Sequence, residues 1–210
     1  MPRVVAIFDV DRTLVRGHTE RVFFRYLVRQ GLLSLRQVLA FFGHVARQPQ
    51  ERFRDKSYLT GLQVEEVVAL ARRCHQEAIV PRVSPAARAC VLDHQARGHA
   101  IALLSGSLSF LLQPLQAELH ADWLVATELQ RRNGRFTGAI AGLHPRGADK
   151  LRLLQELGKT HGLDLSQAYA YGDHIEDIHL FRRIGHPVVV NPSWRLQRAA
   201  RKNHWPIRYF

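Results

Sequence analysis

Cysteine is scarce in this chain of 210 residues, which limits the kinds of site that it can form. Cys74 and Cys90 are its two cysteines, and they belong to no Cys-x-x-Cys motif and no cysteine–histidine pair at zinc-binding spacing. The sequence therefore indicates neither a disulfide framework nor a structural zinc site. We interpret both residues as free, buried thiols in a protein of a reducing compartment.

Long hydrophobic runs are also absent. The apolar run at the N-terminus, Val4–Phe8, is too short for a signal peptide, and the acidic Asp9 follows it. Residues 32–45 form the longest apolar stretch, but polar and charged residues interrupt it, so no segment is expected to span a bilayer. We expect a cytoplasmic location.

Negative charge is in short supply. The chain has 30 Lys and Arg against 18 Asp and Glu, which gives a formal net charge of +12. Such a surface attracts nucleic acid, anionic membranes and phosphorylated small molecules alike, so charge alone selects no function. The excess is mostly arginine and is spread from Arg3 to Arg208, which is more typical of a compositional bias than of a dedicated binding patch.

The rest of the composition, 46% hydrophobic and 23% charged, is typical of a folded soluble domain. Val4–Phe8 is predicted to be a strand buried on both faces. Residues 19–80 carry apolar side chains at spacings of three and four, which predicts helices and no convincing strand. The elements expected after residue 82 are a helix at Pro85–Arg97, strands at Ala100–Leu104, Trp123–Thr127, Ala168–Tyr171 and Pro187–Asn191, a hairpin turn at Asn133-Gly134, a helix capped by Asp149 that ends near Gly162, and a helix around Ile178.

This alternation of strands and helices predicts an α/β fold with a Rossmann-like, doubly wound parallel sheet. The helical block between the first two strands is too long for one crossover helix. We therefore interpret residues 15–81 as an inserted helical cap domain over the carboxyl edge of the sheet, where ligands bind in such folds. Residues 1–14 and 82–210 would then form the catalytic core.

Two acidic clusters follow predicted strands. Asp9 and Asp11 are close enough to repel each other, and a divalent cation such as Mg²⁺ would relieve that repulsion. In a phosphate-transfer reaction one carboxylate would attack phosphorus and the other would handle the leaving-group proton. Asp173 is a candidate metal ligand, and Asp177, one helical turn later, could hold a metal-bound water or a lysine. Taken singly, these acids are more typical of solvated turns and helix starts.

Two further segments could bind phosphate. Ser105 and Gly106 follow a predicted strand and precede a helix, so they offer a hydroxyl and accessible backbone N–H groups. Lys150 begins a later helix and could neutralise phosphoryl oxygens. Each of these features alone is more often structural or solvated. Together the four segments supply every role that a phosphoryl-transfer site needs at one edge of the sheet.

In this order, and with a helical insert after the first, the four motifs resemble those of the haloacid dehalogenase superfamily, in the subgroup that contains phosphoserine phosphatase. The resemblance covers essentially the whole chain. It implies that Asp9 forms an aspartyl-phosphate and that Asp11 acts as general acid and then as general base. It also implies that Mg²⁺ is held by Asp9, by the carbonyl of Asp11 and by Asp173.

The same resemblance implies that Ser105, with Gly106 beside it, and Lys150 bind the phosphoryl group, while Asp177 supports the metal site. Some positions depart from the family pattern, and they bear on the substrate. His18 stands where phosphoserine phosphatases carry an acid that holds the substrate's ammonium group, although Glu20 is close by.

Arg12 replaces a small residue of the pattern, and His174 follows Asp173 where a small or hydroxyl residue is common. Neither change removes a catalytic group. His18, Glu20 and His174 are therefore candidates for contact with the substrate.

The predicted cap is both basic and apolar. Arg21, Arg25 and Arg29 recur every four residues, which places them on one helical face beside an apolar stripe. The simpler interpretation is a solvated face over a packed one. The alternative is peripheral contact with an anionic membrane, since basic amphipathic helices bind such surfaces. The segment from Tyr26 to Val45 loosely resembles the start of the cap of phosphatidylglycerophosphate phosphatases.

We therefore expect a Mg²⁺-dependent phosphomonoester hydrolase that acts on a small metabolite phosphate. One alternative, within the same chemistry, is a lipid headgroup phosphatase similar to the phosphatidylglycerophosphate phosphatases. The other is a non-catalytic basic binding protein built on the same fold, against which the intact acidic set argues. Nucleic acid is not an expected partner, and no oligomeric state is predicted.

Overall fold

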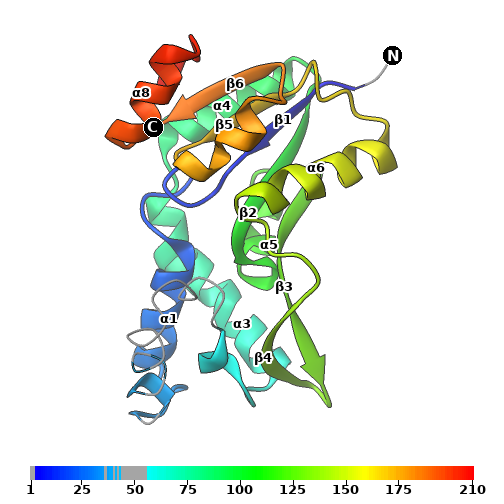
Figure 1. The fold of residues 1–210 in the computed structure, drawn as a ribbon. Helices are drawn as coiled ribbons and strands as arrows, with labels where there is room; N and C mark the ends of the chain where they lie inside the picture. Colours follow the sequence, from blue (N-terminus) through cyan, green and yellow to red (C-terminus); the bar gives the residue numbers. More distant parts are fainter. Residues whose placement is uncertain (1–2, 36, 40, 42, 44–55) are drawn as a thin grey trace.

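A computed structural model describes residues 3–35, 37–39, 41, 43 and 56–210. Its centre is a seven-stranded sheet in the order β4-β3-β2-β1-β5-β6-β7 (Figure 1). The strands are Val5–Phe8 (β1), Ala100–Leu108 (β2), Trp123–Arg132 (β3), Arg135–Ala141 (β4), Tyr169–Gly172 (β5), His186–Val190 (β6) and Ile207–Arg208 (β7). All neighbouring strands are parallel except β3 and β4. This confirms the predicted α/β class and its doubly wound parallel sheet.

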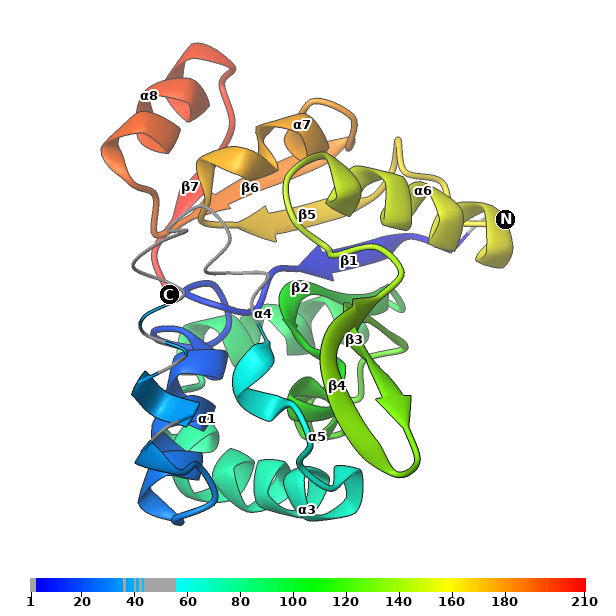
Figure 2. The same ribbon diagram turned by 60° about the horizontal axis from the view of Figure 1, so that its bottom comes forward.

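Helices cover both faces of this sheet (Figure 2). Between β1 and β2 the described helices are α1 (Thr19–Arg29), η1 (Ser57–Leu59), α3 (Val64–Cys74), η2 (His75–Ile79), η3 (Val80–Arg82) and α4 (Pro85–Ala96). The later ones are α5 (Ser109–Glu118), α6 (Ala148–His161), η4 (Ile175–Asp177), α7 (Ile178–Phe181) and α8 (Trp194–Lys202). None of the helices in the described ranges is long and apolar enough to cross a bilayer.

The central strand β1 is buried on both faces, as its sequence predicts. Val5 and Ile7 belong to a hydrophobic cluster that includes residues of α6, α7 and α8. Ala6 and Phe8 face the other way, into a cluster with residues of α4, α5, α1 and α3. Because alternate side chains of a strand point to opposite faces, four consecutive apolar residues suit a strand between two helical layers.

The segment between β1 and α4 is helical in its described part and packs against α5 and the β3–β4 hairpin. Phe23 of α1 meets Phe110 of α5 edge to face, with ring centroids 5.9 Å apart. The hairpin is joined to it by backbone hydrogen bonds, from Gly61 N to Phe136 O at 2.8 Å and from Val64 N to Gly134 O at 2.9 Å. The division into core and cap stays a prediction, and its residues 36, 40, 42 and 44–55 lie outside the described residues.

Two local predictions differ in outcome. The hairpin turn is confirmed, because Asn133 and Gly134 adopt φ values of 50° and 71°, as a two-residue turn between twisted strands requires. The predicted cap of α6 is wrong, since Gly147, with φ at 55°, occupies the N-cap position and Asp149 lies in the first turn. The chain enters α6 through a residue of positive φ, a conformation that glycine adopts without strain.

A buried histidine, His94, packs against Phe8 of β1 and Tyr171 of β5, close to where these strands end. Nε2 of His94, on α4, lies 2.8 Å from the hydroxyl of Tyr171, whose ring stacks on Phe8 with centroids 4.5 Å apart. Its other ring nitrogen lies 2.8 Å from Nδ1 of His99. Burial, together with His99 and the Arg97 cation, lowers the pKa of His94 to about 4. The imidazole is therefore neutral in the folded protein at neutral pH.

This histidine should make folding sensitive to mild acid. The pKa of His94 is lower in the folded protein than its ordinary 6.5, so its stabilising effect is complete above pH 6.5 and is lost as the pH falls toward 4. The loss should be at most about 3 kcal/mol of unfolding free energy. Urea unfolding across this pH range should show a shallower dependence for His94→Gln than for the unchanged protein.

The matched control is His179→Gln, because His179 is exposed on α7. This variant should keep the pH dependence of the unchanged protein. An unaltered pH dependence in His94→Gln would contradict the assignment.

Candidate functional site

A cavity of about 680 Å³ opens at the carboxyl edge of the parallel strands. Nearly all of the predicted site residues line it: Asp9, Asp11, Gly106, Lys150, Asp173, Asp177, His18, Glu20 and His174. Ser105 is buried and does not line it; its hydroxyl oxygen instead accepts a hydrogen bond from the N–H of Ser107, which does. The volume suits a metabolite-sized ligand.

The two innermost parallel strands bring the acidic clusters together. Asp9 follows β1, and its N–H donates to the carbonyl oxygen of Tyr171 at 2.9 Å, so it continues the pairing of β1 with β5. Asp173 follows β5 at the same edge. The carboxyl ends of adjacent parallel strands meet there, which is why carboxylates distant in the sequence share one cavity.

Lys150 links two of these carboxylates. Its Nζ lies 2.7 Å from Oδ1 of Asp9 and 2.9 Å from Oδ1 of Asp177. The side chains of Lys150 and Asp177 are only 8% and 3% exposed, so the ion pairs are shielded from water. Burial alone would lower the pKa of Lys150, but Asp177 and Asp9 outweigh it and raise the pKa. The lysine is therefore a fixed positive charge.

Asp9 is a carboxyl group in an unfavourable environment for charge. Burial raises its pKa to about 8, and the neighbouring Asp177 and Asp173 add to that effect while Lys150 opposes it. Oδ1 accepts the lysine hydrogen bond. Within the described part of the chain, no hydrogen-bond donor reaches the other oxygen, Oδ2, so it remains available to a ligand in the cavity.

Gly172 has a steric reason for its place in the second acidic cluster. A Cβ at this position would lie 2.8 Å from Oδ2 of Asp177 and 3.3 Å from the Phe181 ring. A larger residue would therefore displace Asp177, and with it one of the two anchors of Lys150.

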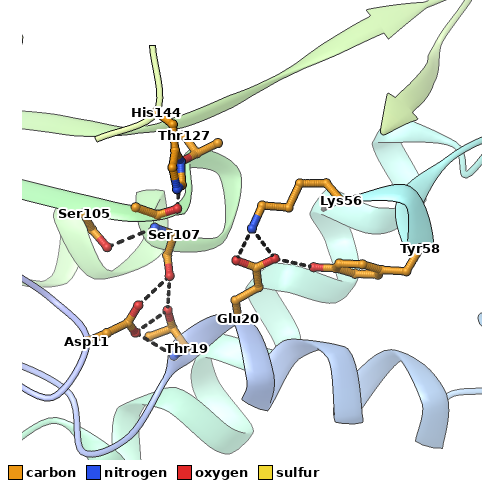
Figure 3. A network of polar contacts seen from close by, with 10 residues as sticks. Asp11, Thr19, Glu20, Lys56, Tyr58, Ser105, Ser107, Thr127 and His144 are labelled. Carbon is orange, nitrogen blue, oxygen red and sulfur yellow. Dashed lines mark hydrogen bonds and ion pairs between the residues drawn. The ribbon is translucent and has the colours of Figure 1, made fainter. Parts of the chain in front are cut away.

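Asp11 is held in place by the start of α1 and the end of β2 (Figure 3). Its Oδ1 accepts hydrogen bonds from the N–H of Thr19 at 2.6 Å and from the Thr19 hydroxyl at 2.8 Å. Its Oδ2 accepts from the hydroxyl of Ser107 at 2.6 Å. Thr19 is the first residue of α1, so the carboxylate also satisfies a free N–H at the helix N-terminus.

The donor set suits a hard divalent cation. Oδ2 of Asp173 and Oδ2 of Asp177 are buried and lack a hydrogen-bond partner in the described ranges, although Arg12 Nε lies 3.3 Å from the former. Burial, with Asp177 adding to it and Arg12 opposing it, raises the pKa of Asp173 to about 6. Buried carboxylate oxygens without donors are costly, and a cation would satisfy them.

The described residues contain no group of three His, Cys, Asp or Glu side chains arranged to hold a metal. The predicted ligand set needs only two such side chains, because it consists of the carboxylates of Asp9 and Asp173 and the backbone carbonyl of Asp11. Mg²⁺ commonly uses one or two carboxylates and completes its shell with water and substrate phosphate. The residues present therefore fit the ion that the family pattern implies.

The three candidate substrate residues differ in their surroundings. Glu20 accepts hydrogen bonds from Nζ of Lys56 at 2.6 and 2.7 Å and from the hydroxyl of Tyr58 at 3.0 Å (Figure 3). His18 is half-buried at the start of α1, and burial, helped by nearby cations and opposed by Asp11, lowers its pKa. His174 is exposed, and its Nδ1 accepts a hydrogen bond from Glu176 N at 3.3 Å.

Sequence reasoning missed several residues of this site. Thr19 and Lys56 gave no sequence signal, because their roles arise only from contacts across the fold. Ser107 stood beside the predicted Ser105-Gly106 pair and could have been found there. His144 is buried at the cavity wall, and its Nδ1 lies 2.7 Å from the hydroxyl oxygen of Thr127. The Thr127 hydroxyl donates its proton to the carbonyl oxygen of Gly106 at 2.7 Å, so the hydroxyl oxygen accepts a hydrogen bond from His144. Arg146 forms a paired contact with Glu176 at 2.7 and 3.1 Å.

Proteins with similar sequences include several named as phosphatases. A histidinol-phosphatase from Neisseria meningitidis is 28% identical over 98% of this chain and 98% of its own length. A phosphoserine phosphatase from Mycobacterium tuberculosis is 28% identical over 98% of this chain and 70% of its own length. A protein from Streptomyces azureus named for inhibition of morphological differentiation is 29% identical over all of this chain and 79% of its own length.

Solved structures share the fold. A protein of unknown function from Bordetella pertussis matches 99% of this chain and 98% of its own with a TM-score of 0.88 at 23% identity. A phosphoserine phosphatase solved as a phospho-aspartyl intermediate analogue matches 99% of this chain and 93% of its own with a TM-score of 0.67 at 21% identity.

The family comparison agrees with the motifs. The model of the haloacid dehalogenase-like hydrolases matches residues 6–182, a range that contains Asp9, Lys150, Asp173 and the cavity between them. The resemblance inferred from the motifs is thereby confirmed. The chain belongs to the haloacid dehalogenase-like hydrolase family, as an enzyme of the phosphoric monoester hydrolase class.

Proposed function

We propose that this enzyme hydrolyses a phosphomonoester through an aspartyl-phosphate on Asp9, with Mg²⁺ as its cofactor. One observation carries the proposal: Asp9, Asp11, Lys150, Asp173 and the end of β2 all line a single cavity. Nucleophile, proton donor, fixed cation and candidate metal ligands are therefore within reach of one phosphate group.

The reaction would have two steps. In the first, a carboxylate oxygen of Asp9 attacks phosphorus, the ester P–O bond breaks, and Asp11 gives a proton to the leaving oxygen, which departs as an alcohol. In the second, Asp11 takes a proton from a water molecule, whose oxygen attacks the same phosphorus. The bond to Asp9 then breaks, inorganic phosphate leaves, and both aspartates return to their starting forms.

The remaining residues would hold the phosphoryl group. Lys150 would neutralise a phosphoryl oxygen while keeping Asp9 in place. Gly106, at the end of β2, would contribute its backbone N–H group, in the role first predicted for Ser105 together with Gly106. Asp9, the Asp11 carbonyl and Asp173 would hold Mg²⁺, which when bound offsets the negative charge of the phosphate and the carboxylates.

A small metabolite phosphate is our proposed substrate. Phosphatases related to this chain are named for phosphoserine and for histidinol phosphate, both metabolite esters. The ion pair between Glu20 and Lys56 counts against a free carboxylate that would bind a substrate ammonium group. The lipid headgroup alternative, the membrane contact and the cytoplasmic location remain predictions. Family membership leaves the non-catalytic alternative without support.

Replacing the proposed nucleophile tests the reaction. Asp9→Asn should reduce hydrolysis of 4-nitrophenyl phosphate by about 10⁴-fold or more, because an amide at position 9 cannot form the acyl phosphate that the proposed reaction requires. Its melting temperature should be unchanged or higher, since the variant removes one of several crowded, buried carboxylates. The matched control is Asp93→Asn, an exposed carboxylate on α4 that should keep full activity. Comparable turnover in Asp9→Asn would overturn the nucleophile assignment.

The cation requirement can be measured apart from catalysis. Chelation should abolish turnover, and Mg²⁺ should restore it. In the Asp9→Asn background, which does not turn over, Mg²⁺ should still raise the melting temperature, because a ligand that binds only the folded state stabilises it. The additional change Asp173→Asn should remove most of that thermal shift. A shift that persisted without Asp173 would contradict its role as a ligand.

A further inference from the structure

Only part of the basic stripe of α1, formed by Arg21, Arg25 and Arg29, lines the cavity. Arg21, Arg25 and Arg29 are all exposed on this helix, one turn apart. Arg21 and Arg25 line the cavity, whereas Arg29 does not. Neither of the two lining arginines has an ion pair or hydrogen bond with any residue in the described ranges. The stripe is thus more than a solvated face, because two of its members face the space that the substrate would occupy.

Other charged groups on this side of the cavity are already paired. Glu20 is bound by Lys56 at 2.6 Å, and Glu176 is bound by Arg146 at 2.7 Å. Neither Glu20 nor Glu176 is therefore left to neutralise Arg21 or Arg25. Asp9 and Asp177 are paired with Lys150, and Asp11 accepts hydrogen bonds from Thr19 and Ser107. Among the described residues, Arg21 and Arg25 therefore add positive charge to the part of the cavity that α1 lines.

An aromatic cluster lies beside the two arginines. Phe24, which follows Arg21 by three residues on α1, lies 5.2 Å from the ring of Tyr58 and 5.0 Å from that of Phe41. Phe41 and Tyr58 lie 5.3 Å apart, and all three rings line the cavity. Residues three apart on a helix share a face, so Phe24 lies on the same side of α1 as Arg21. Arg25 lines the same cavity, so the surface offers apolar contact beside positive charge.

We propose that the alcohol portion of the substrate carries a second anionic group, a carboxylate or a phosphate, which Arg21 and Arg25 bind. Its carbon skeleton packs on Phe24, Phe41 and Tyr58. Two guanidinium groups without an ion-pair partner among the described residues attract such a group and repel an ammonium group, so they select among phosphomonoesters by charge. This inference rests on the proposed function, because it names the class of ester that the same site hydrolyses.

Matched pairs of substrates test the inference. Glycerol 3-phosphate and 3-phosphoglycerate differ by a carboxylate, and AMP and adenosine 3′,5′-bisphosphate differ by a phosphate. The enzyme should prefer the doubly anionic member of a pair by about tenfold or more in kcat/KM, which is the low end expected for hydrogen bonds to a charged group. Equal kcat/KM values within both pairs would overturn the inference.

Variants of the stripe supply the control. Arg21→Met and Arg25→Met each remove a contact that the bound substrate and the transition state share, so KM should rise for the substrate with the second anionic group. Each variant should thereby lower the preference within a pair, measured as the ratio of the two kcat/KM values, by about tenfold. Arg29→Met, on the same stripe but outside the cavity, should keep it. A loss in Arg29→Met equal to that in the other two, or an equal loss on both members of a pair, would contradict specific binding.

Two further comparisons identify the source of the ester and test the proposed function separately. Glycerophosphoinositol 4-phosphate and phosphatidylinositol 4-phosphate in vesicles carry the same headgroup in soluble and lipid form, so their relative rates identify the source of the anionic ester. Hydrolysis of 4-nitrophenyl phosphate, compared with Asp9→Asn, tests the proposed function separately. Turnover that depends on Asp9 but shows no anionic preference would defeat the inference alone, whereas absence of such turnover would defeat the proposed function.

Discussion

Lys150 is a buried ammonium ion between the carboxylates of Asp9 and Asp177, and the arrangement of the site depends on this pairing. Buried charges are costly unless they are paired in good geometry, so the three groups must be delivered accurately. The parallel sheet does this by ending β1 and β5 at one edge, while α6 brings the lysine from the side. Gly172 leaves the space that Asp177 needs. The lysine offsets the repulsion of the neighbouring carboxylates only in part, which leaves the site suited to a cation and a phosphate group.

The second constraint links this charged centre to the helical segment after β1. Asp11 accepts hydrogen bonds from the first residue of α1, so the start of that helix is fixed relative to the proposed catalytic carboxylates. Arg21 and Arg25 of this helix line the same cavity as Asp9 and Asp11. One short loop from β1 to α1 thus connects the proposed chemistry to the proposed selection of the leaving group.

Sequence patterns predicted the parts of this structure that depend on local order or on parallel strand ends. The four apolar residues of β1 indicated a strand buried on both faces, and Asn133-Gly134 indicated its turn. The acidic clusters could be assigned to one site because successive parallel strands end at the same edge. What the sequence did not predict rests on contacts between distant residues, such as Thr19 with Ser107, 88 positions apart, and Lys56 with Glu20. The cap of α6 was misassigned because a backbone conformation at Gly147, rather than an acidic side chain, begins that helix.

The central claim is that the phosphoryl group passes through Asp9. The most direct measurement is to quench the enzyme during turnover of a substrate, reduce any acyl phosphate with borohydride, and map the modified residue by mass spectrometry. The account predicts modification at Asp9, absent when substrate is omitted and absent in Asp9→Asn. Modification at a different residue, or rapid turnover with no acyl phosphate at position 9 at any quench time, would contradict it.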